Sequence, residues 1–160
     1  MIVVADSGPP HYLILIEQID LLRRLYGQVA VPEAVVDELR ASGSPPIVSE
    51  WIAHPPEWVV VISVPQGQIE SITDDLDRGE RAAIALAGTI GADLLLIDDA
   101  AGRLEAKRRN LRVTGTLGVL RTGAEEGIID VPHTLARLRA TSFYADDALI
   151  IAIFAQWLQP

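Results

Sequence analysis

The stretch GADLLLIDDAAGR, Gly91 to Arg103, indicates the fold class of this chain. Its apolar run is short and lacks polar alternation, which is typical of a strand buried on both faces of a parallel sheet. The run ends in two adjacent acids, Asp98 and Asp99, and a helical pattern follows at once. A buried strand that leads directly into a helix is the repeating unit of α/β folds, so the stretch predicts a strand end that carries carboxylates.

The same unit recurs along the chain. Short β-branched or leucine-rich runs predict strands over 2–6, 28–31, 58–64, 94–97 and 111–114. Apolar residues at helical spacing predict helices over 11–25, 32–41, 66–72, 78–90, 100–109 and 117–126. Strands separated by helices of this length predict an α/β fold with a mainly parallel central sheet and helices on both faces. In such sheets ligands bind beyond the carboxyl ends of the strands.

Length and composition limit the classes of protein to which this chain can belong. The 160 residues, 49% of them hydrophobic, predict a single domain over 1–160 with one sizeable core. We expect 142–160 to form a C-terminal helix used for packing or dimerisation, since its apolar run is too short to cross a membrane. The chain has no cysteine, which excludes disulfides and thiolate chemistry and favours a cytoplasmic location. Its net charge of −9 means that a nucleic-acid partner needs a local basic patch or a bound cation.

Three acids outside the opening stretch have either an ordinary structural role or a functional one. Asp6 follows the first strand, where it serves either a turn or the ligand edge of the sheet. Glu38 falls at the border of the buried face when its helix is wound at about 100° per residue, so it is either paired or functional. Glu80 completes a capping box with Asp77, but it also lies on the small-residue side of its helix that packs inward.

Asp98 and Asp99 divide two roles between them. One of them is expected to cap the following helix, whose N-terminus favours negative charge. The other is expected to point across the strand ends toward Asp6. If these acids converge with Glu38 and Glu80, each close pair repels by roughly 4 kcal/mol at an effective dielectric near 20, so the group requires protons or a metal. Oxygen donors without cysteine or a histidine pair favour Mg²⁺ or Mn²⁺.

Five stretches of the chain, in order, resemble the PIN-domain family of metal-dependent ribonucleases, and within it a prokaryotic VapC-like branch of predicted nucleic-acid-binding proteins. The matching stretches are VVADSGP, LYGQVAVPEAVVDEL, RGERAAIALA, LLLIDDAAGR and VTGTLGVL. The first departs from the usual Asp-Ser-Ser-Pro-Leu-Ile at Gly8 and Pro10, and Gly8 lacks a hydroxyl that bonds near the metal. The resemblance implies a mainly parallel sheet flanked by helices.

The resemblance also implies the site. Matched residue by residue, the catalytic acids are Asp6, Glu38, Glu80 and Asp98 or Asp99. Mg²⁺ or Mn²⁺ would be held by Asp6, Glu80 and Asp98 or Asp99, while Glu38 holds the ion or activates the attacking water.

Residues near this predicted site are candidates for contact with the substrate. Arg103 begins the densest basic cluster of the chain, which also contains Lys107, Arg108, Arg109 and Arg112. Such a cluster is either a solvated helix face or a phosphate contact, and Arg103 is the best single candidate for the contact. Ser7 and Thr116 are short hydroxyls near strand ends, and they either cap turns or orient water.

The sequence therefore predicts a Mg²⁺- or Mn²⁺-dependent endoribonuclease that hydrolyses RNA phosphodiesters, as the toxin of a toxin-antitoxin pair. The expected partners are RNA, a cognate antitoxin protein and a second copy of the chain, with no membrane. A catalytically weak PIN scaffold that binds protein or RNA is the alternative. A third reading is a phosphotransfer or phosphatase domain with Asp6 or Asp98 as nucleophile.

Overall fold

A computed structural model describes residues 1–159 and shows an α/β fold around a five-stranded sheet with the order β3-β2-β1-β4-β5. All four strand pairs are parallel, which confirms the predicted fold class. The strands are β1 (Val3–Ala5), β2 (Val29–Pro32), β3 (Val59–Ile62), β4 (Leu94–Leu96) and β5 (Val113–Thr114). Because β1 is the central strand, residues that follow it lie at the middle of the sheet edge.

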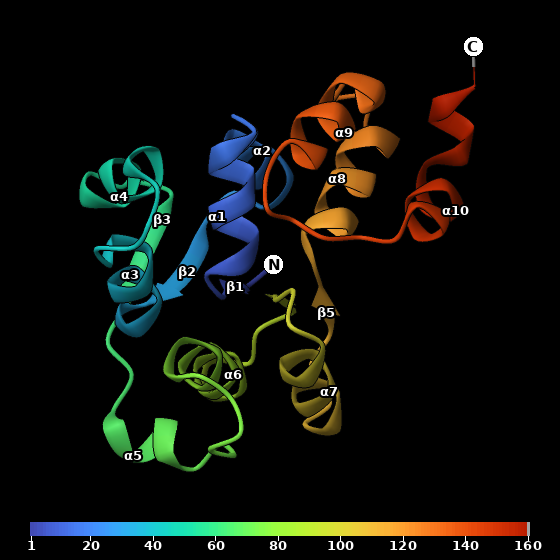
Figure 1. The fold of residues 1–160 in the computed structure, drawn as a ribbon. Helices are drawn as coiled ribbons and strands as arrows, with labels where there is room; N and C mark the ends of the chain where they lie inside the picture. The colour runs from blue at the N-terminus through green and yellow to red at the C-terminus, as the bar shows by residue number, and fades with distance from the viewer. Residues whose placement is uncertain (160) are drawn as a thin grey trace.

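Helices cover both faces of this sheet (Figure 1). They are α1 (Gly8–Leu15), α2 (Asp20–Tyr26), α3 (Glu33–Arg40), α4 (Pro46–Ala53), α5 (Gln66–Glu70), α6 (Arg78–Ile90), α7 (Ala100–Arg108), α8 (Thr116–Glu125), α9 (Val131–Arg139) and α10 (Asp147–Leu158). Alternate strand residues point to opposite faces. Val3, Ala5 and Leu96 belong to the core beneath α1, α2 and α8. Val4 and Leu95 belong to the separate core beneath α6 and α7.

The prediction of a single helix over 11–25 is wrong, because the structure has two helices there. The first, α1, begins at Gly8, since Pro9 and Pro10 fit the first helical turn, where a missing N–H is not needed. It ends where Glu17 adopts a positive φ of 58°, and α2 begins at Asp20. Apolar spacing continues through this break, so the periodicity alone did not reveal it.

The C-terminal segment forms one short apolar helix. Within the range expected to be helical, 142–160, the helix α10 spans Asp147–Leu158, and residue 160 lies outside the described residues. Ile150 and Phe154 anchor α10 on the core, whereas Leu149 and Ile151 are exposed. Across residues 1–159, every helix is too short or too polar to traverse a lipid bilayer.

Candidate active site at the carboxyl edge of the sheet

Asp6 lies at the centre of the carboxyl edge, directly after β1. Its backbone N–H donates to the carbonyl of Leu96 at 2.9 Å, which ties it to the neighbouring strand β4. Asp6 is only 4% exposed, and its Oδ1 has no hydrogen-bond partner among the described residues. A buried carboxylate oxygen without a donor is rare, because burial of an unpaired charge is costly.

Asp98 is held beside Asp6 by the start of α8. The Thr116 backbone N–H donates to Asp98 Oδ1 at 2.6 Å, and the buried Thr116 hydroxyl donates to Oδ2 at 2.7 Å. Two glycines leave room for this carboxylate. A Cβ at Gly115 would lie 2.5 Å from Oδ1, and a Cβ at Gly8 would lie 3.0 Å from Oδ2. Gly8, where the family usually has serine, therefore allows close approach of α1 to Asp98.

Asp99 caps α7. Its Oδ2 accepts a hydrogen bond from the Gly102 backbone N–H at 2.8 Å, in the usual geometry of an N-cap aspartate. One of the two adjacent acids thus caps the helix as expected, whereas Asp98 is bonded to Thr116.

Glu38 reaches the site from the buried border of α3. The Gly79 backbone N–H, in the first turn of α6, donates to Glu38 Oε1 at 2.9 Å. Gly79 is buried beneath the carboxylate, and a Cβ there would lie 2.5 Å from Glu38 Cδ. Glu33, Asp37 and Arg40 are the exposed positions of α3, whereas Glu38 is partly buried. The position of the Glu38 carboxylate over α6 thus depends on the absence of a side chain at residue 79.

Asp77 and Glu80 open α6, as the capping box predicted. Asp77 Oδ1 accepts from the Glu80 backbone N–H at 2.8 Å. The sequence suggested only a capping role for Asp77, yet its charge also acts on Asp6, Glu38 and Glu80. Its position three residues before Glu80, on the first turn of the same helix, was the signal in the sequence for this proximity.

A family model described as PIN domain (DUF3368) matches residues 2–159 of the chain. The chain belongs to the PIN-domain family. A search of curated proteins found no match. PIN domains are typically metal-dependent nucleases, so membership makes nuclease chemistry a reasonable expectation at the acidic edge of this one.

Burial, assisted by repulsion between neighbouring acids, raises the pKa of two carboxyls of this PIN domain. Burial, opposed by the Ser7 backbone N–H and assisted by the charges of Glu38, Asp77 and Asp98, raises the pKa of Asp6 to about 7. Burial and the Asp77 carboxylate, with smaller effects of Asp99 and Asp6, raise the pKa of Glu80 to about 8. These mutual effects show that carboxylates from distant parts of the chain lie within electrostatic reach.

The remaining two acids are also harder to ionise than usual. Burial and the charge of Asp77 raise the pKa of Glu38, while the Ser7 side chain and the hydrogen bond from the Gly79 N–H favour its charged form. Burial likewise raises the pKa of Asp98 against the two bonds from Thr116 and the positive charge of Arg103. A nearby cation would therefore stabilise all these carboxylates in their charged form.

A hard divalent cation fits the chemistry of this site better than any other metal. The donors are carboxylate oxygens, and the unpartnered Oδ1 of Asp6 lies among them. As the side chains stand within residues 1–159, no three acids or histidines are close enough together to hold a metal ion. The donor set is thus suitable, but the carboxylates must move toward one another to share an ion.

The raised pKa values predict how folding stability depends on pH. Between the unfolded values, 3.8 for Asp6 and 4.5 for Glu80, and the folded values of about 7 and about 8, the folded protein binds more protons than the unfolded chain. Stability from these groups is therefore full at low pH and falls as pH rises through this window. Burial lowers the pKa of His11 from its usual value of 6.5. His11 therefore has the opposite effect, because its contribution makes stability rise with pH, and this happens at lower pH.

The fall is expected to be clearest between about pH 6.5 and about pH 8, and to amount to roughly 1–2 kcal/mol, because solvent screens the partly exposed Glu80. Urea unfolding in the presence of a chelator measures it, with Mn²⁺ expected to remove most of it. A stability that rises over this interval without metal would contradict the proposed crowding of charges.

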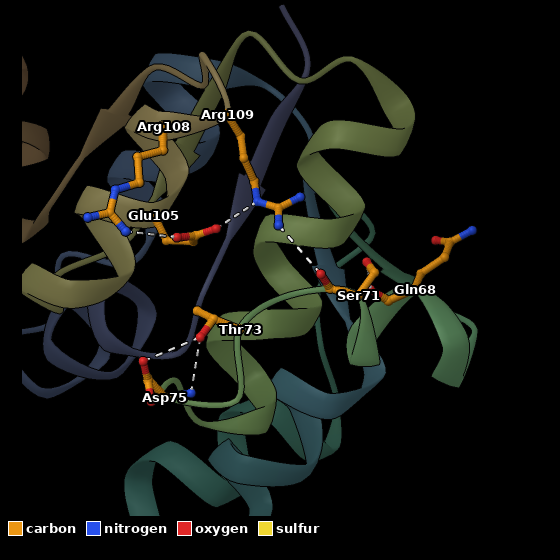
Figure 2. A network of polar contacts seen from close by, with 7 residues as sticks. All are labelled: Gln68, Ser71, Thr73, Asp75, Glu105, Arg108 and Arg109. Carbon is orange, nitrogen blue, oxygen red and sulfur yellow. Dashed lines mark hydrogen bonds and ion pairs between the residues drawn. The ribbon is translucent and has the colours of Figure 1, made fainter.

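The basic cluster of α7 divides into two groups. Arg109 Nε donates to Glu105 at 3.0 Å, Arg108 lies 3.6 Å from the same carboxylate, and Arg109 also reaches the Ser71 carbonyl at 3.5 Å (Figure 2). Arg109 thus joins the end of α7 to the loop between α5 and α6, whereas Arg108 pairs within α7. By contrast, Arg103 and Lys107 form no ion pair within residues 1–159.

Proposed function

We propose that this PIN domain is a metal-dependent endoribonuclease that hydrolyses RNA phosphodiester bonds. The observation that supports it best is Asp6, a nearly fully buried acid with an unpartnered oxygen, within electrostatic reach of Glu38, Asp77 and Asp98. Structural acids are normally paired, so an arrangement that raises the pKa of Asp6 to about 7 destabilises the fold unless something positive binds there.

Under this proposal the acids have distinct roles. Asp6, Glu80 and Asp98 would hold Mg²⁺ or Mn²⁺, with Asp99 at its margin, because its Oδ2 already caps α7. When bound, such an ion polarises the phosphoryl oxygen and lowers the pKa of water.

The other residues position these acids and the substrate. Glu38, held by the Gly79 N–H, either contributes to ion binding or accepts the proton of the attacking water. Thr116 fixes the orientation of Asp98, since its N–H and hydroxyl donate to both carboxylate oxygens. Ser7 lines one cavity with Glu38 and favours the charged form of that carboxylate, so it would help to orient Glu38. Arg103, whose charge acts on Asp98, would contact a substrate phosphate.

We extend the proposal to the biological setting expected from the sequence. The protein would act in the cytoplasm as the toxin of a toxin-antitoxin pair. The exposed apolar side chains of α10, Leu149 and Ile151, would serve contact with the antitoxin or a second copy of the chain.

The proposed reaction is tested with labelled single-stranded RNA, double-stranded RNA and single-stranded DNA. We expect the purified chain to cut internal bonds of single-stranded RNA when Mn²⁺ or Mg²⁺ is added, and to stop when a chelator removes the metal. Gel analysis of the products distinguishes internal cutting from trimming at the ends. Cleavage that persists in chelator, or its absence with both metals, would contradict the proposal.

A catalytically weak scaffold is the second candidate, and one observation favours it. No three acids within residues 1–159 are already arranged to hold a metal ion. In that case the chain would bind RNA or a partner protein without cutting RNA. A protein that binds RNA but neither binds Mn²⁺ nor cleaves would establish this alternative.

A further inference from the structure

A groove leads away from Asp98 along α7. It consists of two adjoining cavities of about 400 and 570 Å³, and both are lined by Asp98, Arg103 and Leu149. The first extends over Gly118 toward Tyr144, and the second follows α7 to Lys107. A ligand that lies in this groove would therefore begin at the proposed cleavage site and pass over α7 and the segment before α10.

The cavity along α7 contains two cations, Arg103 and Lys107, and one acid, Asp98, while the other cavity adds Asp146. Arg103 and Lys107 are one turn apart on α7, and neither forms an ion pair within the described residues. Their neighbours Arg108 and Arg109 instead pair with Glu105 and lie outside the lining of the groove. The cavity along α7 therefore keeps an excess of positive charge in a chain of net charge −9, which favours an anionic ligand there.

An aromatic ring stands over the same groove. Tyr144 is 89% exposed, the most exposed of the large apolar or aromatic side chains described. Its backbone is well anchored, because Phe143 packs edge to face on Tyr12 with ring centroids 5.0 Å apart and Ser142 contacts the Tyr12 hydroxyl at 3.1 Å. Leu104 and Leu149, both about half exposed, provide apolar surface nearby.

We propose that this groove is a nucleotide-binding subsite, in which Arg103 and Lys107 hold backbone phosphates of single-stranded RNA and Tyr144 stacks on a base. The choice of RNA as ligand rests on the proposed function. Cations that follow the backbone, together with an exposed aromatic ring, are the combination by which proteins bind unpaired bases. A paired base offers no free face, so the subsite selects single-stranded RNA near the cut.

Binding is measured without cleavage, in the Asp6→Asn background and in chelator, by fluorescence anisotropy of a labelled RNA of about ten nucleotides. Stacking on one base predicts that Tyr144→Ala weakens binding by roughly 5- to 100-fold, whereas Tyr144→Phe retains affinity. Lys107→Ala is expected to lower affinity and to reduce the salt dependence of binding by about one counterion.

An abasic backbone of the same length separates stacking from other effects. Tyr144→Ala is expected to leave binding of the abasic strand unchanged, because no base remains to stack. Equal losses on both strands, no loss on either, or no RNA binding at all would overturn the subsite. Unchanged RNA binding with loss of self-association in Tyr144→Ala would assign the ring to a protein contact instead.

The outcomes distinguish the subsite from the cleavage reaction. RNA binding that depends on Tyr144 in a wild-type protein that never cuts RNA would support the subsite and contradict the nuclease. Metal-dependent cutting of RNA, together with binding that does not depend on the bases, would support the nuclease and contradict the subsite.

Discussion

Asp6→Asn is expected to reduce metal-dependent RNA cleavage by more than about 100-fold, since even residues that only orient a metal ligand change activity by 10- to 100-fold. The substitution keeps the shape of the side chain and removes its charge. Asp6 is the central acid of the site, and its charge acts on Glu80 while those of Glu38 and Asp98 act on it. Its loss therefore removes the carboxylate that the others surround.

The same substitution is expected to make the fold more stable. At about pH 8 the Asp6 carboxyl, whose pKa is about 7, is charged and buried among other acids. Replacing it by a neutral amide should raise the free energy of unfolding by on the order of 1–3 kcal/mol in chelator. Stability measured by urea and activity measured on RNA should thus change in opposite directions.

Asp74→Asn is the matched control for this experiment. It makes the same change of charge at an exposed position that has no side-chain hydrogen bond or ion pair within residues 1–159. Both its activity and its stability should stay close to wild type. A cleavage rate of Asp6→Asn within about threefold of the wild-type rate would remove Asp6 from the mechanism.

Gly79→Ala is expected to reduce cleavage by more than about tenfold and to change the free energy of unfolding by less than about 1 kcal/mol. A Cβ at residue 79 would lie 2.5 Å from Glu38 Cδ, so the carboxylate must leave its position over α6. Glu38 is a flexible side chain at the border of the core and can turn toward solvent. Alanine in the first turn of a helix also offsets part of the strain, because it is favoured over glycine by up to about 1 kcal/mol.

Gly88→Ala in the same helix is its control. A Cβ there meets nothing within 4 Å, so the substitution should raise stability by about 0.5–1 kcal/mol and leave activity unchanged. The two variants contain the same replacement in α6 and differ only in the contact with Glu38. Equal activity of the two would show that the position of Glu38 is not needed for cleavage.

The chain sequence predicted those features that depend on local pattern. Buried apolar runs identified the strands, and the acids that follow them reached the same edge because all strands are parallel. Asp77 and Asp99 occupy N-cap positions that residue type and spacing indicated.

Features that depend on contacts between distant residues were not predictable. The bond from Gly79 to Glu38 joins residues 41 positions apart, and only the packing of α3 against α6 creates it. The break at Glu17 requires a positive φ in a residue that carries a side chain, which apolar spacing does not reveal. The division of the basic cluster likewise depends on the position of Glu105 in space.

Binding of Mn²⁺, measured by calorimetry near pH 7 in two buffers of different ionisation enthalpy, tests the central claim most directly. We expect saturable binding at or below millimolar Mn²⁺ with release of protons, because carboxyls with pKa values of about 7 and about 8 must lose their protons to bind an ion. Asp74→Asn should bind Mn²⁺ as the wild type does, and Asp6→Asn should not. No Mn²⁺ binding by the wild type, or equal binding by Asp6→Asn, would contradict the account.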